Sequence, residues 1–317
     1  MGRYLINRFL STIPVLIGTS LFTFLLVRLV PCDPIQIMLG PEVQGNAREE
    51  ITRLYGLDRP WPVQYIEWIF NVLRGDLGDS IRTSLPVTES ILQRLPATLE
   101  LTLLALIIGL LIGIPLAIIA AQHRGRLADG LFSVVVLIGI SMPGFWLATL
   151  LVLVFALNLR WLPSIGFVPL IENPAENLRR MILPALSLGV GFGATTMRFT
   201  RSSLLEVFNQ DYVRTARAKG LREHAVIYRH ALKNALIPVV TVTGIQVGRL
   251  LGGAVIIEQI FALPGIGRYI FDAISQRDYP VIQGTVLFFT IVFILINLFV
   301  DVLYGVIDPR IKVAGSD

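Results

Sequence analysis

The side chains that could perform catalysis are few in this sequence, and their spacing fits no catalytic site. The three histidines, His123, His224 and His230, form no metal-ligand set with one another, and no Cys/His ligand set is present. None of the three lysines follows a glycine, so a phosphate-binding G-x-x-x-x-G-K-[ST] loop is absent. No Ser/His/Asp or Cys/His group offers a nucleophile. The sequence therefore predicts no catalytic residue, no metal and no cofactor in this chain.

The most concentrated charge lies in Asp211–Pro238, DYVRTARAKGLREHAVIYRHALKNALIP, between two strongly apolar stretches. Residues 198–234 hold eight basic and three acidic side chains, a net charge of +5 that equals the formal charge of the whole chain. Because this excess is local, it predicts no general affinity for nucleic acid. Three interpretations fit the segment: a loop that only fixes topology, a DNA-binding helix-turn-helix, or a helix that docks to a soluble partner. The helix-turn-helix is disfavoured because the unit is short, lacks a third helix and is tethered at both ends.

Helical spacing divides this segment into two helices. We expect the first at Tyr212–Lys219, capped by Asp211 and ended by Gly220 in a left-handed conformation. The second helix is expected to carry one apolar stripe, formed by Leu221, Ala225, Tyr228 and Leu232. The segment thus predicts a short displayed helix that a second helix braces.

The elements that position this segment are long apolar stretches. The chain is 54% hydrophobic and 15% charged, whereas soluble domains average about 25% charged residues. Runs of roughly 20 apolar residues predict membrane-spanning helices. We expect six spans: Phe9–Val30, Ala97–Ala121, Leu131–Leu159, Met181–Met197, Ala235–Ile257 and Val281–Ile307. The predicted fold class is an all-α membrane protein with six transmembrane helices.

The expected spans contain clusters of small residues and several prolines. Clusters of small residues occur at 109–117, 186–196 and 250–255, and in lipid such clusters allow helix backbones to approach closely. Pro115, Pro143 and Pro184 predict kinks. We therefore expect tight helix crossings and bent spans.

Basic residues predict the orientation of the chain. Lys and Arg are about twice as dense in 1–8, 122–130, 198–234 and 308–317 as in 31–95, 160–180 and 258–280. Both termini and the basic segment are thus expected to be cytoplasmic. Pro31 stands before Cys32, where a lipoprotein cleavage site needs a small residue, so the first span is expected to be retained.

The outer segment 31–95 contains one amphipathic pattern, WPVQYIEWIFNVLRG. Pro62 lies near the start of the expected helix, and one face carries Val63, Ile66, Phe70 and Leu73. This helix either packs on the membrane surface or on a partner, or only covers the spans.

The run YVRTARAKGLREHAVIYRHALKNALIP resembles the coupling-loop motif of bacterial ABC importer permeases, in the form of the dipeptide/oligopeptide/nickel-type family. The similarity extends over nearly the whole chain. It includes RYLINRFLSTIPVLIGTSLFTFLLVRLVPCDP, GLDRPWPVQYIEW, GDLGDS, RLPATLELTLLALIIG and LLGGAVIIEQIFALPGIGRYIFDAISQRDYPVIQG. The sequence departs from the general motif, whose leading E-A-A falls on Arg214, Thr215 and Ala216 when Gly220 is the anchor.

The resemblance implies a permease subunit of the type I ABC importer fold in the bacterial cytoplasmic (inner) membrane. It implies an N-terminal tail and first span (1–30), an outer, periplasmic segment (31–95), and a permease core (96–317) that includes the cytoplasmic coupling segment (198–234). The implied partners are a second homologous permease, two P-loop ATPase subunits that bind ATP and magnesium, a solute-binding protein and membrane lipid. The residues implied to contact an ATPase are Tyr212, Arg214, Thr215, Ala216, Arg217, Ala218, Lys219, Gly220 and Leu221.

Arg249 lies near the middle of the fifth expected span, where a charged side chain must face a cavity or a partner. Gln246, Leu250 and Gly253 share its helical face, and a guanidinium in such a place can steady a peptide carboxylate. The alternative is a pair between Arg249 and a carboxylate or helix-end carbonyl of a neighbouring subunit.

The outer loop after the fifth span offers four candidate contacts for a binding protein: Glu258, Arg268, Arg277 and Asp278. Each of them has the alternative role of holding the loop itself. The predicted cargo is a di- or oligopeptide or a related small solute, with nickel chelates or glutathione as alternatives. A different class, an ion-driven secondary carrier or channel, would usually need carboxylates deep within the spans, and the sequence places none there.

Overall fold

The computed structural model describes residues 2–29, 52–53 and 58–307 of the 317-residue chain. The predictions for Cys32 and for the C-terminal residues 308–317 lie outside this part. The helices, in chain order, are α1 (Gly2–Leu29), α4 (Trp61–Leu73), α5 (Val87–Gln122), α6 (Leu127–Ser141), α7 (Gly144–Leu151), α8 (Pro174–Val207), α9 (Asp211–Ala218), α10 (Glu223–Ala225), α11 (Leu232–Ile260), α12 (Ile266–Gln276) and α13 (Tyr279–Ile307). Two π-helical segments, Val152–Asn158 and Val226–Ala231, continue α7 and α10.

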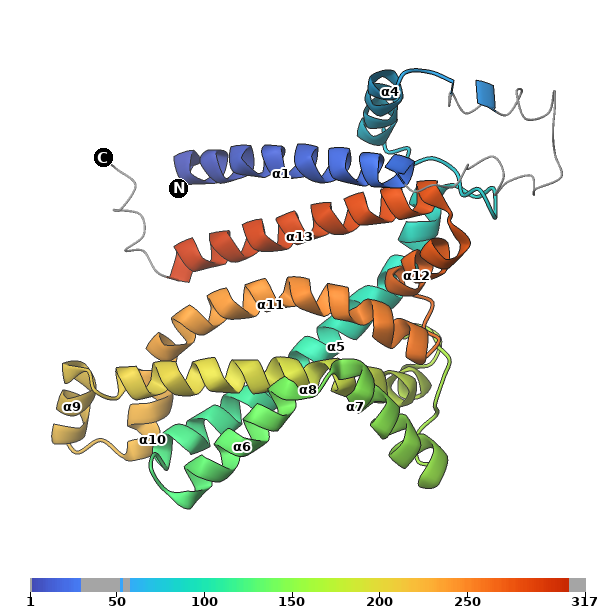
Figure 1. Ribbon diagram of the computed structural model, residues 1–317. Helices are drawn as coiled ribbons and strands as arrows, with labels where there is room; N and C mark the ends of the chain where they lie inside the picture. Colours follow the sequence, from blue (N-terminus) through green and yellow to red (C-terminus); the bar gives the residue numbers. More distant parts are fainter. Residues whose placement is uncertain (1, 30–51, 54–57, 308–317) are drawn as a thin grey trace.

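The long helices form a bundle (Figure 1). α1, α8, α11 and α13 run roughly along its length, and α5 crosses it obliquely. The start of α1 lies at the same end as α9 and α10, whereas α4 and α12 lie at the opposite end. The fold thus separates the segments that we expect to be cytoplasmic from those that we expect to be periplasmic.

Four helices in the described part are long and apolar enough to cross a membrane: Val87–Gln122, Pro174–Val207, Glu223–Ile260 and Tyr279–Val300. A fifth crossing exists if the bent pair Gly130–Ser141 and Gly144–Asn158 forms one span. The first expected span corresponds to α1, a helix of 28 residues in which Leu10–Leu25 is the described apolar stretch. The all-α membrane class is therefore confirmed, and the count of six spans stays a prediction.

The expected span Leu131–Leu159 is broken in the structure, because α6 and α7 meet at an angle of 99°. Met142 between them has an extended backbone with φ −79° and ψ 119°. It precedes Pro143, and the proline ring disfavours helical geometry in the residue before it. The kink predicted at Pro143 is thus confirmed, but it is sharp enough to break the helix.

α5 and α8 form the most extensive helix pair among the described residues, and they cross closely. A Cβ atom placed on Gly193 of α8 would lie 2.9 Å from the carbonyl oxygen and 3.2 Å from the Cα of Gly109 in α5. One placed on Gly189 would lie 2.9 Å from the carbonyl oxygen of Ala105. Backbones therefore touch here, as the clusters of small residues predict.

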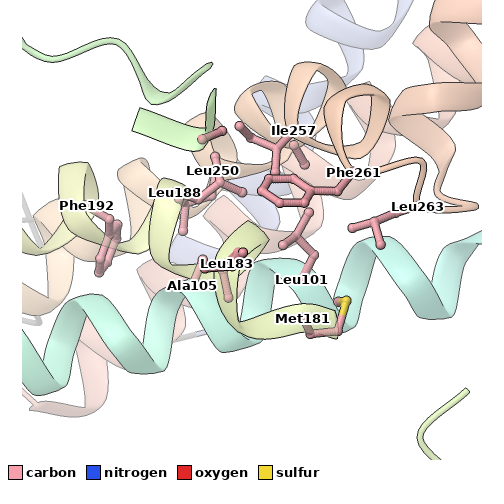
Figure 2. Packing of buried hydrophobic residues seen from close by; sticks show 13 residues of the cluster. Leu101, Ala105, Met181, Leu183, Leu188, Phe192, Leu250, Ile257, Phe261 and Leu263 are labelled. Carbon is pink, nitrogen blue, oxygen red and sulfur yellow. The ribbon is translucent and has the colours of Figure 1, made fainter. Parts of the chain in front are cut away.

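The largest cluster of buried side chains fills the junction of α5, α8 and α11 (Figure 2). Leu101 of α5, Met181 of α8 and Ile257 of α11 are each at most 1% exposed. Phe261, directly after α11, and Leu263 close this cluster at the outer end. Because lipid tails are as apolar as these side chains, close packing rather than burial from water holds the three helices together.

A short hairpin precedes α5. An isolated antiparallel bridge joins Asp79 to Pro86, and α5 then begins at Val87, within the expected outer segment 31–95. The expected amphipathic helix is present as α4, with Pro62 in its first turn.

Candidate functional site

The displayed helix of the basic segment is α9, eight residues from Asp211 to Ala218. Gln210, with an extended backbone, precedes the helix, so the prediction that Asp211 is the capping residue was wrong. Asp211 is instead the first helical residue, where its negative charge complements the helix dipole. The Thr215 hydroxyl donates to the Asp211 carbonyl oxygen at 2.9 Å, which ties the first turn together.

Gly220 ends α9 as expected, with a left-handed backbone at φ +76°. Its N–H donates to the Arg217 carbonyl at 2.9 Å, and the Leu221 N–H donates to the Ala216 carbonyl at 3.4 Å. This pair of bonds is a Schellman motif, which requires a left-handed residue after the helix. A Cβ atom on Gly220 would meet nothing within 4 Å, so the need for glycine here is conformational.

One face of α9 packs on its own chain. Val213 and Ala216 are buried against Val226 and the half-buried Val207 of α8. The Asn234 side chain donates to the Tyr212 hydroxyl at 2.8 Å. Ala216 is therefore the one predicted coupling residue that this chain buries. The others are exposed: Tyr212, Arg214, Thr215, Arg217, Ala218, Lys219, Gly220 and Leu221.

An ion pair bridges the turn at Gly220. Arg217 donates to Glu223 through Nη2 at 2.8 Å and through Nε at 3.2 Å. Its guanidinium also lies 5.5 Å from the centre of the Phe208 ring. Donation to the Glu223 carboxylate raises the pKa of Arg217. Both side chains are partly exposed, so water screens this pair and it fixes the angle of α9 more than it stabilises the fold.

The predicted apolar stripe of the second helix was wrong. The structure buries Val226, Ile227 and Ala231, and it exposes Leu221 and Tyr228. The reason is the π-helical segment Val226–Ala231, whose wider turn rotates the buried face away from a 3.6-residue pattern. As expected, the helix does return to the bundle, because it continues directly into α11.

Gln246, Arg249, Leu250 and Gly253, which were expected to face the transport path together, differ in exposure. Leu250 belongs to the buried cluster and Gln246 is buried, whereas Arg249 is exposed. Arg249 lies instead in an exposed stripe of α11 with helical spacing, made of Ile245, Arg249, Gly252 and Ile256. This stripe is left open by the described residues, as are Lys233, Asn234 and Pro238 near the start of α11.

Gly253 lies beside a cavity of about 240 Å³ at the break between α6 and α7. Met142, Gly144, Ser187 and Ile256 contribute to its lining. The break in the helix thus leaves space next to the exposed stripe of α11.

Two of the four outer-loop candidates are buried. Glu258 is fully buried at the end of α11, where it accepts from the Thr98 hydroxyl at 2.7 Å and from the Arg268 N–H at 2.9 Å. Thr98 in turn accepts from the Ile266 N–H at 2.9 Å. One carboxylate therefore links α5 and α11 to the first turn of α12, where a negative charge is favourable.

Asp278 has a similar role at the start of α13. Its carboxylate accepts from the Ser80 hydroxyl at 2.6 Å and from the Ile81 N–H at 3.2 Å. The preceding Arg277 has a left-handed backbone and an exposed side chain. The Arg268 Nε atom lies 3.8 Å from the Asp272 Oδ2 atom. The hydrogen bonds of Glu258 and Asp278 fit the role of holding the loop. A contact of Arg268 or Arg277 with a binding protein stays a prediction.

The roles of Thr98 and Ser80 were not predicted from the sequence, although both residues lie in runs, RLPATLELT and GDLGDS, that carry the family resemblance. Their value as hydrogen-bond partners depends on contacts with distant parts of the chain. No group of three or more His, Cys, Asp or Glu side chains suited to a metal ion occurs in the part of the chain that the structure describes.

The chain belongs to the family described as "binding-protein-dependent transport system inner membrane component", which it matches over residues 113–313. Residues 1–102 match the N-terminal region of such membrane components. The family that the motifs indicated is thereby confirmed. The protein is a multi-pass permease component of the inner membrane.

Its relatives include several transport permeases of similar length. The dipeptide transport system permease protein DppB of Alkalihalophilus pseudofirmus is 45% identical, over 98% of this chain and 100% of the relative. The oligopeptide permease protein AppB of Bacillus subtilis is 40% identical, over 98% and 100% of the two chains. The glutathione permease protein GsiC of Salmonella paratyphi A is 43% identical, over 98% and 99%.

Solved structures of the MetNI methionine ABC transporter, in inward-facing conformations, have a similar fold. One chain gives a TM-score of 0.58 at 19% identity, over 69% of this chain and 96% of the other. A second crystal form gives a TM-score of 0.54, also at 19% identity. The ABC importer permease fold is thus confirmed.

Proposed function

We propose that this chain is the permease subunit of an ATP-driven importer that carries dipeptides, oligopeptides or related small peptides into the bacterial cytoplasm. A second, homologous permease would complete the path, a solute-binding protein would deliver the cargo, and two ATPase subunits would bind ATP and magnesium. In this proposal both termini are cytoplasmic, and the chain hydrolyses no ATP itself.

The observation that carries the proposal is the geometry of α9. The helix is anchored on one side by Val213 and Ala216, ended by Gly220, and exposed on its other side. A partner that binds the exposed side can push the helix, and the continuous path from α10 into α11 transmits the displacement to the bundle. Such an anchored but displayed helix fits a site that receives movement from an ATPase.

The first test is purification of the intact chain from its native membrane, with identification of the proteins recovered. The wild type should bring down two P-loop ATPase chains and a second permease. Gly220→Val should reduce ATPase recovery about 5- to 30-fold, because a β-branched residue in the left-handed conformation costs about 1–2 kcal/mol. The second permease should remain.

Gly75 supplies a matched control at the opposite end of the molecule. It follows α4 in the same Schellman arrangement, with φ +86° and no atom within 4 Å of a Cβ placed on it. Gly75→Val should therefore impose the same backbone strain and leave ATPase recovery intact. Recovery of the wild-type chain alone, with transport that collapses with the proton gradient, would contradict the proposal and favour a secondary carrier.

Arg249 gives a second prediction, for the path itself. If its exposed guanidinium holds the peptide carboxylate in transit, Arg249→Gln should lower peptide uptake about tenfold, because a charge-assisted hydrogen bond contributes about 1.5–3 kcal/mol. The permease pair should still be recovered intact. Arg249→Lys, which keeps the charge, should lose less. Unchanged uptake in Arg249→Gln, or loss of the second permease, would exclude this role; the latter would favour a structural pair with the neighbouring subunit.

A further inference from the structure

α4 is held against the outer end of α1 by one of its faces. Tyr65 and Trp68 pack around Phe24 of α1, with ring centroids 5.3 and 6.3 Å from it, and the Tyr65 hydroxyl lies 2.8 Å from the Ser20 hydroxyl. Arg28 of α1 donates to the Gln64 side chain at 3.1 Å. These contacts involve the face of α4 that covers α1.

A second face of α4 is apolar and uncovered. It consists of Val63, Ile66, Phe70 and Leu73, whose exposed fractions are 40%, 53%, 56% and 77%. α4 does cover α1, as one of the two interpretations expected, but its apolar face is not the face that packs there. An exposed stripe of four large apolar side chains marks a surface that contacts protein or membrane lipid instead of water.

A third, narrow face of α4 is polar. It carries Glu67, Asn71 and, just after the helix, Arg74, all of them exposed. Arg59, which precedes the helix, pairs with Glu67 on this side. After docking on α1, the helix is thus still amphipathic, with its apolar and polar faces next to each other.

The direction of α4 indicates what covers the apolar face. The helix runs crosswise to α1 at its outer end and projects beyond the side of the bundle (Figure 1). Phe22 and Leu29, near the same end of α1, are also strongly exposed apolar side chains. Trp61, Tyr65 and Trp68 are of the types that concentrate at the membrane–water interface.

We propose that α4 lies in the plane of the outer membrane–water interface and inserts its apolar face among the lipid acyl chains. Glu67, Asn71 and Arg74 then face water and headgroups, as in other interfacial amphipathic helices. Through Tyr65, Trp68 and Gln64, this anchor fixes the depth of α1 in the bilayer. A protein partner is disfavoured because the stripe has no polar or charged member to give it specificity.

The test uses single-cysteine reporters in the complete transporter, reconstituted in lipid nanodiscs. Cys32, the one cysteine of the chain, is replaced by serine, and cysteine is introduced at Ile66, Phe70, Glu67 or Asn71 in turn. Each variant is labelled with the environment-sensitive fluorophore NBD. Quenching is then measured with phospholipids that carry a doxyl group on the acyl chain, and separately with aqueous iodide.

The reporters at Ile66 and Phe70 should be quenched at least twofold more by doxyl lipid than by iodide, with a blue-shifted emission. Those at Glu67 and Asn71, only one turn away or less, should show the opposite preference and serve as matched controls. Iodide quenching at all four positions would overturn the proposal, because the stripe would then face water. Protection of Ile66 and Phe70 from both quenchers would also overturn it, since a protein would then cover the stripe.

Discussion

Replacement of Gly193 by leucine is expected to prevent stable folding of the permease. The Cα atom and carbonyl group of Gly109 occupy the space that a side chain on Gly193 would need, and backbone atoms of a helix cannot move aside as a flexible side chain can. α5 and α8 would have to separate, and the buried cluster that both helices share with α11 would open. Overpacking of this kind costs about 3 kcal/mol or more.

The measurement for Gly193→Leu is the yield and the melting temperature of the detergent-purified protein, followed by size-exclusion chromatography. Gly18→Leu is the matched control, because Gly18 also lies in a long helix and a Cβ placed there meets nothing within 4 Å. We expect the Gly18 variant to behave like the wild type and the Gly193 variant to aggregate or fail to accumulate. Equal yield and melting temperature for the two variants would disprove the close crossing of α5 and α8.

The second large effect is expected for Glu258→Ala. Removal of the carboxylate leaves the Thr98 hydroxyl and the Arg268 N–H without their acceptor in a buried site. Loss of one partner of a buried charged network typically costs about 3–5 kcal/mol. The shortened side chain also leaves a void beside Gly265, where the carboxylate now fills the position of a possible Cβ. The turn between α11 and α12 should therefore loosen.

Hydrogen exchange across residues 258–276, together with the melting temperature, measures this effect. Glu258→Ala should lose protection in α12 and melt several degrees lower, whereas Glu258→Gln, which keeps one acceptor oxygen and the shape, should fall between it and the wild type. Glu172→Ala is the control, since that glutamate is exposed. If exchange in α12 is unchanged while delivery by the binding protein is lost, Glu258 is a contact residue instead of a support.

Local features of this protein could be predicted from the sequence. The membrane class follows from composition, and the left-handed end of α9 follows from Gly220 after a short helical pattern. The small residues at 109–117 and 186–196 also indicated close helix crossings, although not which helices would pair. Each of these inferences depends on residues that are near one another in the chain or on a property of glycine that holds in any context.

The features that could not be predicted depend on distant partners or on irregular helix geometry. The sequence left open whether Glu258 and Asp278 contact a binding protein or hold the loop, because their partners, Thr98 and Ser80, are 160 and 198 positions away. The buried face of the second helix of the basic segment was misassigned because a π-helical segment changes the period. Pro143 predicted a kink, but a single proline does not determine that the two helices meet at 99°.

The bond between Ser80 and Asp278 has a consequence for the order in which the protein can be completed. A chain is synthesised from its N-terminus, so the hairpin before α5 leaves the ribosome long before Asp278 exists. The hairpin must therefore stay without its buried acceptor while α5, α8 and α11 are inserted. The hairpin gains this acceptor only when the chain up to the start of α13, the last helix among the described residues, has been synthesised, and a chain that stops before that point leaves the Ser80 hydroxyl without it.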